Sequence, residues 1–461
     1  MPYISLNPAT NQVLQTHTSW DAAHLAVVLE RAHVAQQAWA QTSIARRAEV
    51  LRDVAIHLRV QREQYAALIT LEMGKLLREA RAEVEKCASG CDYYAQNAEV
   101  FLGDEIVKTD ATKSYVSYQP LGVVLAVMPW NFPFWQVFRA AAPALMAGNA
   151  MVLKHASNVP QCALAIEKIF SDSGLPQGLF TTLMIEADQV ADAIASPAVQ
   201  AVTLTGSEAA GRKVAACAGQ HLKKCVLELG GSDPFIVLQD ADLEFTAKVA
   251  VESRFLNCGQ SCIAAKRFIL VPEIADAFVR LFRAKVEALK LGDPMQDDTQ
   301  IGPMARIDLR ETLHQQVSDS IAQGALALTG CKPAERSGVY YQASILDRVS
   351  DKTRAYHEEL FGPVAIVIRA TDEADALRIA NQTRFGLGSS IWSKDVARAE
   401  QLATQLQAGC TFINGMVKSD PRLPFGGIKA SGFGRELAQQ GIREFVNAKT
   451  VWIRSVRASE R

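Results

Sequence analysis

Long apolar runs are missing from this chain of 461 residues: no stretch of eighteen apolar residues occurs, so no membrane-spanning helix is expected. A strong charge of either sign is also missing, because 48 basic residues and 49 acidic residues leave a net charge of −1. This balance gives no reason to expect nucleic acid or an anionic membrane as a partner. The first residues lack both a basic start and an apolar segment, so no secretory signal is expected.

The spacings that are typical of metal sites and disulfide frameworks are missing too. The eight histidines form no H-x-x-x-H pair and the cysteines form no Cys-x-x-Cys pair, so no metal site is expected. Nine cysteines, an odd number without close spacing, indicate reduced thiols and a cytoplasmic protein. A small buried side chain is the default interpretation for most of them.

Alternating helical and strand-like segments are present, and they are typical of an α/β protein. Residues 21–102 predict helices, because apolar and charged residues recur there every three or four positions. Short apolar strands and helical stretches then alternate. Val123–Val127 and Phe180–Ile185 are predicted strands, and Gln161–Phe170 between them is a predicted helix. This order predicts a doubly wound parallel sheet. A second α/β region is expected from Gly230 to about Pro424.

Two common phosphate-binding motifs are absent. The segment from Gly206 to Gly211 follows a predicted strand and opens a helix, but it lacks the Lys-Ser/Thr ending of a P-loop. No G-x-G-x-x-G occurs at the first strand–helix turn either. A dinucleotide would therefore bind in a manner that differs from the usual Rossmann fingerprint.

Cys262 and Glu228 are the strongest candidates for chemistry. Cys262 follows a Gly-Gln turn, and Glu228 ends an apolar stretch directly before Gly230 and Gly231. A cysteine nucleophile must lose its proton, and a carboxylate on a glycine-rich turn can take it directly or through water. Burial at the end of an apolar strand would disfavour the ionised carboxylate and move its pKa towards the working pH. Cys258 lies in the same loop, and we interpret it as a supporting residue.

Seven motifs occur in the order found in the aldehyde dehydrogenase superfamily, which the chain resembles over nearly its whole length. They lie at residues 127–133, 154–158, 204–207, 228–231, 259–262, 359–363 and 424–427. The resemblance implies an α/β fold with a Rossmann-type cofactor domain, an α/β catalytic domain and a small β oligomerisation arm. It assigns residues 1–106 and 121–228 to the cofactor-binding domain, 229–423 to the catalytic domain, 107–120 and 436–461 to the arm, and 424–435 to a return segment.

The resemblance also implies the oxidation of an aldehyde to an acid. Cys262 would attack the carbonyl, and Asn131 with the Cys262 N–H would hold the oxyanion, each donor lowering the barrier by about 3 kcal/mol. Hydride would pass to a nicotinamide cofactor, and Glu228 would activate the water that hydrolyses the thioester. Glu359 would hold the nicotinamide ribose. The residues implied for cofactor binding are Trp130, Lys154, Ser157, Gly206, Ser207, Glu359 and Phe361.

The segment from Trp130 to Arg139, with Lys154 to Asn158, is similar to bacterial and cyanobacterial succinate-semialdehyde dehydrogenases. Arg139 and Ser419 would then bind the far carboxylate, since a guanidinium can hold a carboxylate with two hydrogen bonds. Leu256 stands where some of these enzymes carry a second arginine, although Arg254 is nearby. Glutarate semialdehyde and aliphatic aldehydes stay open as substrates. Acyl transfer to coenzyme A, which would not need Glu228, and a non-catalytic protein on the same fold are weaker alternatives.

Ser157 favours NADP over NAD. NAD-restricted relatives often have glutamate at this position, whereas a neutral hydroxyl near Lys154 suits a 2′-phosphate. The alternative is that Ser157 caps the helix leading into Gln161 and leaves NAD usable. The segments 107–119 and 444–453 resemble the family's projecting hairpin and C-terminal strand, so a homodimer or a dimer of dimers is expected.

Overall fold

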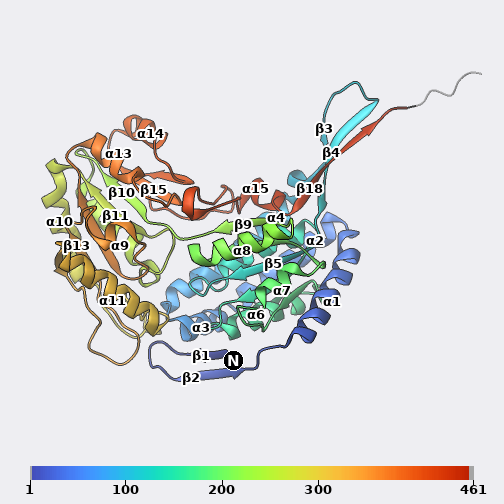
Figure 1. Ribbon diagram of the computed structural model, residues 1–461, viewed down its shortest axis with the longest axis horizontal. Coiled ribbons are helices and arrows are strands. Elements are labelled where there is room, and N and C mark those ends of the chain that lie inside the picture. Colours follow the sequence, from blue (N-terminus) through green and yellow to red (C-terminus); the bar gives the residue numbers. More distant parts are fainter. Residues whose placement is uncertain (1–2, 456–461) are drawn as a thin grey trace, which may run out of the picture.

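The computed structural model describes residues 3–455 and shows two sheets with flanking helices and a projecting arm (Figure 1). The predicted cofactor-domain segment 1–106 includes residues 1–2, and the predicted arm segment 436–461 includes residues 456–461. These residues lie outside the described range. Within it, no helix combines the length and the apolar character that a membrane crossing requires. Along the chain, the last parallel strand of the first sheet ends at Glu228, and the first strand of the second sheet begins at Asp233.

The first sheet has the strand order β17-β9-β8-β5-β6-β7, and all its pairings are parallel except that of β17 with β9. Its strands are β5 (Val123–Met128), β6 (Ala150–His155), β7 (Phe180–Thr182), β8 (Val199–Thr205), β9 (Lys224–Glu228) and β17 (Gly432–Phe433). The connecting helices are α5 (Trp135–Met146), α6 (Pro160–Asp172), α7 (Val190–Ala195) and α8 (Glu208–Gln220). The predicted doubly wound sheet is confirmed, and its order reverses between β5 and β8, where such sheets bind ligands.

One predicted strand is too long, and several helices, α5 among them, were not predicted. β7 ends at Thr182 rather than Ile185, because the Met184 carbonyl accepts a hydrogen bond from Trp20 N at 2.6 Å instead of continuing the ladder. Helix α5 is buried along its whole length. A helix buried on all sides lacks the apolar and polar faces from which a helix is recognised in a sequence.

The N-terminal region contains a hairpin and four helices. The hairpin pairs β1 (Tyr3–Leu6) with β2 (Val13–His17). The helices, which agree with the predicted helical range 21–102, are α1 (Ala22–Ala40), α2 (Ile44–Val60), α3 (Arg62–Met73) and α4 (Leu77–Leu102). Asp21 and Ser43 cap α1 and α2 by accepting hydrogen bonds from backbone N–H groups, as expected for these residue types.

The second sheet has the order β12-β13-β14-β11-β10-β15-β16 and is parallel except for the pair β12–β13. Its strands are β10 (Asp233–Val237), β11 (Ala265–Leu270), β12 (Leu326–Thr329), β13 (Ser344–Asp347), β14 (Val364–Arg369), β15 (Gly388–Trp392) and β16 (Cys410–Ile413). The helices of this region and of the return are α9 (Leu243–Phe255), η1 (Leu256–Gly259), α10 (Pro272–Glu287), α11 (Ile307–Ala322), α12 (Arg354–His357), α13 (Glu373–Asn381), α14 (Val396–Ala403), η2 (Lys429–Ser431) and α15 (Ala438–Arg443).

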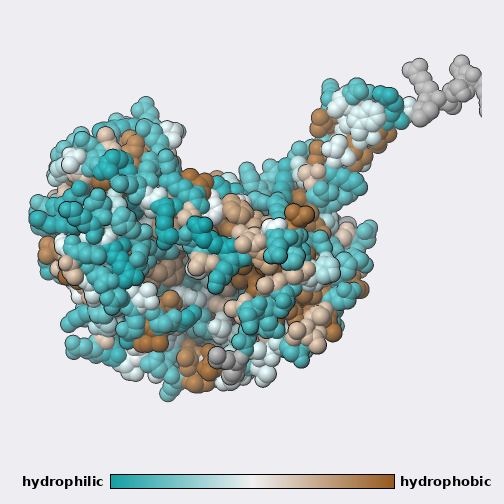
Figure 2. All heavy atoms as spheres, in the orientation of Figure 1, coloured by the Kyte–Doolittle hydropathy of each residue, from teal (hydrophilic) through white to brown (hydrophobic). Residues whose placement is uncertain are grey.

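A three-stranded antiparallel sheet forms the arm that projects from the body in Figure 1. It has the order β18-β4-β3, with β3 (Glu105–Ile106), β4 (Lys113–Pro120) and β18 (Val446–Ile453). The long pairing runs from Val446 opposite Pro120 to Ile453 opposite Lys113. Apolar side chains are visible on the arm in Figure 2, and Ile106, Val107, Trp452 and Ile453 are exposed there.

Glu83 of α4 fixes the start of α5. Its Oε1 accepts hydrogen bonds from Phe134 N at 2.9 Å and Trp135 N at 3.0 Å, which are unpaired donors at a helix N-terminus. Its Oε2 pairs with Lys75, and both side chains are buried. Lys75 Nζ also lies 3.7 Å from the centre of the Phe132 ring. The buried charges of Glu83 and Lys75 therefore hold the segment from Phe132 to Trp135 in place.

The substitution Glu83→Ala is expected to destabilise the fold by about 3–5 kcal/mol, because it leaves Lys75 buried without its partner. Thermal unfolding followed by circular dichroism would measure the loss as a lower midpoint. The matched control is Glu85→Ala, which removes an exposed pair with Arg59 and should cost about 0–1 kcal/mol. Equal midpoints for the two variants would contradict the role assigned to Glu83.

Candidate active site

The loop that carries Cys262 is held in an unusual backbone conformation. Asn257 and Cys258 both have φ of 54°, in the left-handed region. Asn257 Nδ2 donates to the carbonyl oxygens of Asn131 at 2.7 Å and Gln260 at 3.1 Å, and Asn257 N donates to Glu79 Oε2 at 3.0 Å. Strained residues of this kind persist where surrounding contacts determine them. Here the contacts come from the predicted oxyanion segment and from α4.

The structure brings Asn131 to the nucleophile loop. Its Nδ2 donates to the Gln260 carbonyl at 3.0 Å, and its side chain is buried. An amide nitrogen carries two N–H groups, so one remains for a ligand. Asn131 therefore contacts the loop that carries Cys262, and its role as an oxyanion donor stays a prediction.

Cys262 is half-buried and lines a cavity of about 100 Å³. Burial raises the pKa of its thiol to about 12, although Lys266 and Arg139 act in the opposite direction. The resting side chain is therefore protonated at neutral pH and needs a base before it can attack. Lys266 Nζ donates to the carbonyls of Ser261 at 2.9 Å and Cys262 at 2.8 Å, which fixes the loop.

Gly231 allows the two catalytic segments to approach each other. A Cβ atom at this position would lie 2.8 Å from the Cys262 carbonyl oxygen, so a larger residue would push the loop away. Cys258, in the same loop, is buried and donates from Sγ to the Gly302 carbonyl at 3.3 Å. Burial raises the pKa of the Cys258 thiol, which makes it a poor nucleophile.

Glu228 ends β9 with its side chain 2% exposed. Within residues 3–455, neither carboxylate oxygen has a hydrogen-bond partner. Burial first, and then the nearby Glu436, raise the pKa of Glu228 well above its usual range. Its oxygens are thus free to accept from water, although the residues that line the Cys262 cavity do not include Glu228.

Arg139 and Ser419 line the same cavity as Cys262. The Arg139 guanidinium pairs with buried Glu436, and its Nη2 donates to Thr205 Oγ1 at 3.3 Å. Ser419 Oγ accepts from Trp135 Nε1 at 3.0 Å. The other candidate arginine, Arg254, is fully buried and donates to backbone carbonyls, including Val364 O at 2.7 Å, so it does not reach the cavity.

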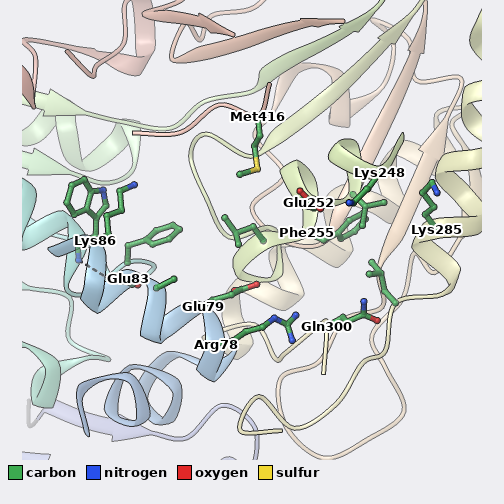
Figure 3. A pocket seen from close by; sticks show the side chains of 16 residues that line it. Arg78, Glu79, Glu83, Lys86, Lys248, Glu252, Phe255, Lys285, Gln300 and Met416 are labelled. Carbon is green, nitrogen blue, oxygen red and sulfur yellow. Dashed lines mark hydrogen bonds between the residues drawn. The ribbon is translucent and has the colours of Figure 1, made fainter. Parts of the chain in front are cut away.

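Lys86 of α4 was not predicted. It lines the Cys262 cavity and donates from Nζ to Ser419 Oγ at 2.7 Å. It also lines a second, larger cavity of about 680 Å³ (Figure 3). The available signal was the spacing of Glu79, Glu83 and Lys86, which places three charges on one face of a helix.

A cavity of about 630 Å³ lies at the carboxyl ends of β5, β6 and β8, beside α8. Lys154 lines it and donates from Nζ to the His155 carbonyl at 2.8 Å, and burial lowers the pKa of Lys154 to about 8. Lys213, an exposed residue of α8 that was not predicted, lines it too. Two cations at the switch point of the sheet fit a dinucleotide phosphate.

The turn that opens α8 comes directly after β8. Ser207 accepts a hydrogen bond from Ala210 N at 3.3 Å and so caps the helix, while Gly206 N donates to the Glu228 carbonyl at 3.0 Å. The N-terminus of this helix is a favourable place for a phosphate. Ser157 is exposed in the turn after β6. Its alternative role as a cap is wrong, because the N-cap of α6 is Val159 and no side chain caps it.

The remaining cofactor candidates are Glu359, which contacts the Gly230–Gly231 turn, and the ring pair of Trp130 and Phe361. Glu359 Oε1 accepts from Gly231 N at 3.1 Å and lies 3.1 Å from Lys266 Nζ. Trp130 meets Phe361 edge to face, with ring centres 5.9 Å apart. Trp130 follows β5 of the first sheet and Phe361 precedes β14 of the second, so this ring contact joins the two regions.

Comparison with known proteins identifies relatives along the whole chain. The family model described as "Aldehyde dehydrogenase family" matches residues 2–451. A probable succinate-semialdehyde dehydrogenase (NADP+) of Synechocystis is 51% identical, covering 98% of this chain and 100% of that protein. Succinate-semialdehyde dehydrogenase (NADP+) 1 of Mycobacterium tuberculosis is 49% identical, with the same coverage. The crystal structure of the Streptococcus pyogenes succinic semialdehyde dehydrogenase with NADP+ has a TM-score of 0.96 at 39% identity, covering 98% and 100%.

Substitutions at Cys262 and Glu228 are expected to block different steps. Cys262→Ala should lower aldehyde oxidation by at least about a thousandfold. Glu228→Ala should retain a rapid burst of reduced cofactor and then stall, because acylation precedes the step that needs the base. Stopped-flow absorbance of the reduced cofactor measures both. Wild-type turnover by the Glu228 variant would contradict the assignment.

The pH dependence follows from the raised pKa of Glu228. A base must be ionised to act, and the carboxyl loses its proton only well above the range of an ordinary glutamic acid. The steady-state kcat should therefore fall as the pH is lowered, beginning well above the usual glutamate range. A kcat profile that stays flat down to pH values near an ordinary glutamate pKa would rule out this base.

Proposed function

Because this chain belongs to the aldehyde dehydrogenase family, we propose that it oxidises succinate semialdehyde to succinate with NADP as the preferred hydride acceptor. One observation carries the choice of substrate: the cavity that contains the Cys262 thiol is also lined by Arg139, Lys86 and Ser419. A thiol suits an aldehyde carbon, and the cationic and hydroxyl groups suit a carboxylate on the same small molecule. Relatives about half identical over their full length carry this activity in their names.

The first step joins Cys262 to the aldehyde. The Cys262 thiol loses its proton to solvent, and Sγ forms a bond to the carbonyl carbon. The carbonyl oxygen becomes an oxyanion, which accepts hydrogen bonds from the remaining N–H of Asn131 and from Cys262 N. Asn131 is already positioned by its bond to the Gln260 carbonyl, so little reorganisation accompanies the charge development.

The second and third steps are oxidation and hydrolysis. A bound nicotinamide cofactor would supply the hydride acceptor; loss of hydride from the carbon attached to Sγ would leave a thioester on Cys262. Glu228 then takes a proton from water, the hydroxide adds to the thioester carbon, and the C–S bond breaks to release the acid and the thiol. The two oxygens of Glu228 have no hydrogen-bond partner among the described residues, which supports its role as the base.

Arg139 and Ser419 are proposed to bind the substrate carboxylate. The Nε of Arg139 faces Glu436 and Nη2 reaches Thr205, whereas Nη1 has no hydrogen bond to a residue in the described range. The guanidinium also lies 4.9 Å from the centre of the Phe425 ring, which orients its plane. This fixed geometry favours a carboxylate that approaches from the cavity.

Lys154, Ser157 and Lys213 support the preference for NADP. Lys154 and Lys213 line the cavity at the switch point of the sheet, and Ser157 follows the same strand as Lys154. The positive charge attracts a third phosphate group, and a neutral serine does not repel it. The other proposed cofactor contacts are those of Trp130, Gly206, Ser207, Glu359 and Phe361. Glu359 would hold the nicotinamide ribose, with its carboxylate oriented by Gly231 and Lys266.

The arm supports a homodimer or a dimer of dimers. Its sheet has β18 and β3 as edge strands, and exposed Ile106, Val107, Trp452 and Ile453 give it apolar surface. Edge strands and projecting apolar surface are normally covered by a partner. The domain boundaries given above and the cytoplasmic location stay predictions.

Steady-state kinetics across four aldehydes tests the proposed substrate. Succinate semialdehyde should give the highest kcat/KM, and butanal, which lacks the carboxylate, should be at least about tenfold poorer. Glutarate semialdehyde and betaine aldehyde probe chain length and charge. Each is measured with NADP and with NAD. A preference for butanal or betaine aldehyde would contradict the proposal.

The substitution Ser157→Glu tests the cofactor preference. A carboxylate at this position should repel a 2′-phosphate and accept hydrogen bonds from ribose hydroxyls. The ratio of kcat/KM for NADP to that for NAD should fall by about tenfold or more. Ser171→Glu, which adds the same charge at an exposed position in α6, is the control and should leave the ratio unchanged. An unchanged ratio in the Ser157 variant would show that another residue discriminates.

A further inference from the structure

Lys86 lies between the two cavities on the catalytic side of the molecule. It is half-buried on α4, near Glu83 in Figure 3. It lines the cavity of about 100 Å³ that contains Cys262 and the outer cavity of about 680 Å³. Its Nζ lies 4.5 Å from the centre of the Trp135 ring. The same two cavities are also both lined by Phe132, Trp135, Leu256 and Met416, and Lys86 is the cation that they share.

Lys86 has no carboxylate partner within residues 3–455. The nearby acids are already engaged: Glu83 pairs with Lys75, and Asp420 pairs with Arg422. Burial and the neighbouring Arg139 lower the pKa of Lys86 to about 8. A cation removed from water without a counter-ion is costly, so an anionic ligand at this position would be stabilised.

Ser419 adds a donor at the same point. Its Oγ accepts from Lys86 Nζ at 2.7 Å and from Trp135 Nε1 at 3.0 Å. A hydroxyl oxygen has two lone pairs and one hydrogen, so both acceptor positions are occupied and the O–H is left to donate. No described residue accepts from it. The hydroxyl hydrogen is therefore available to a ligand oxygen in the cavity that Ser419 lines.

The positive charge of Arg139 is already compensated by a neighbouring carboxylate. Its guanidinium already faces the carboxylate of Glu436, and both side chains are buried. The pair is close to neutral as a unit. Lys86 is thus the unpaired cation among the residues that line the Cys262 cavity, apart from the exposed Lys418.

We propose that Lys86 is a specificity-determining residue, whose ammonium group binds the far carboxylate of the aldehyde together with the Ser419 hydroxyl. The proposal rests on the function proposed above and deepens it. Arg139, held by Glu436, forms the second side of the same anion site. An aldehyde without the carboxylate gains nothing from Lys86, so the residue selects among substrates without taking part in the chemistry.

The test compares Lys86→Met and Lys86→Gln with wild type. Both remove the charge, and glutamine retains a donor for Ser419. For succinate semialdehyde, KM should rise about tenfold or more in both variants with kcat little changed, because charge-assisted contacts are lost. For butanal, both constants should stay within about threefold of wild type. The control is Lys248→Met, an exposed lysine across the outer cavity in Figure 3, which should change neither substrate.

Inhibition by succinate separates this proposal from the proposed function. Succinate carries the carboxylate but cannot be oxidised, so its inhibition constant against butanal should weaken about tenfold in Lys86→Met and stay unchanged in Lys248→Met. If wild type shows no preference for succinate semialdehyde while this weakening occurs, the proposed function fails and the anion site stands. Equal losses for succinate semialdehyde and butanal, or succinate inhibition that is independent of Lys86, would overturn the role of Lys86.

Discussion

The buried carboxylate of Glu83 is the contact on which the geometry of the site depends. It joins Lys75, helix α4 and the first N–H groups of α5. A carboxylate away from water is stable only where a cation and donors compensate it, and Glu83 has both. Because α5 begins there, Asn131 is held just before it, against the Gln260 carbonyl. A residue outside every recognised motif therefore helps to position Asn131, the proposed oxyanion donor.

Helix α4 contributes more than a scaffold. Glu79 receives the N–H of Asn257 in the strained nucleophile loop, Glu83 anchors α5, and Lys86 reaches Ser419. These three residues lie on one face at helical spacing, so the orientation of a single helix sets three contacts at once. Burial raises the pKa of Glu79 to about 7, although the neighbouring Lys75 acts in the opposite direction.

The predicted parts of the fold were those with a local signal. The strands of the first sheet and the helices of residues 21–102 have clear periodicity, and the parallel sheet followed from their order. Helix α5 lacked such a signal because it is buried on every side. The two-residue strand β17 exists only because β9 offers an edge, with Gly432 opposite Glu228. Such pairing depends on tertiary structure and leaves no pattern in the sequence.

The same distinction applies to the site. Motif resemblance named Cys262, Asn131 and Arg139. In the structure Cys262 and Arg139 line one cavity, and Asn131 contacts the loop that carries Cys262. The resemblance did not name Lys86, because the partner of that lysine, Ser419, is 333 positions away. It also did not anticipate that Arg139 would pair with Glu436. Contacts between distant segments decide which charges are free, and a single sequence does not record them.

Lys266 serves two parts of the site at once. It donates to the Cys262 carbonyl and pairs with Glu359. Lys266 lowers the pKa of the Cys262 thiol, whereas Glu359 raises it. A ligand that draws the Glu359 carboxylate away from Lys266 therefore changes the acidity of the Cys262 thiol without touching it. Thermodynamic reciprocity requires the converse: ionisation of Cys262 changes the affinity for that ligand by the same factor.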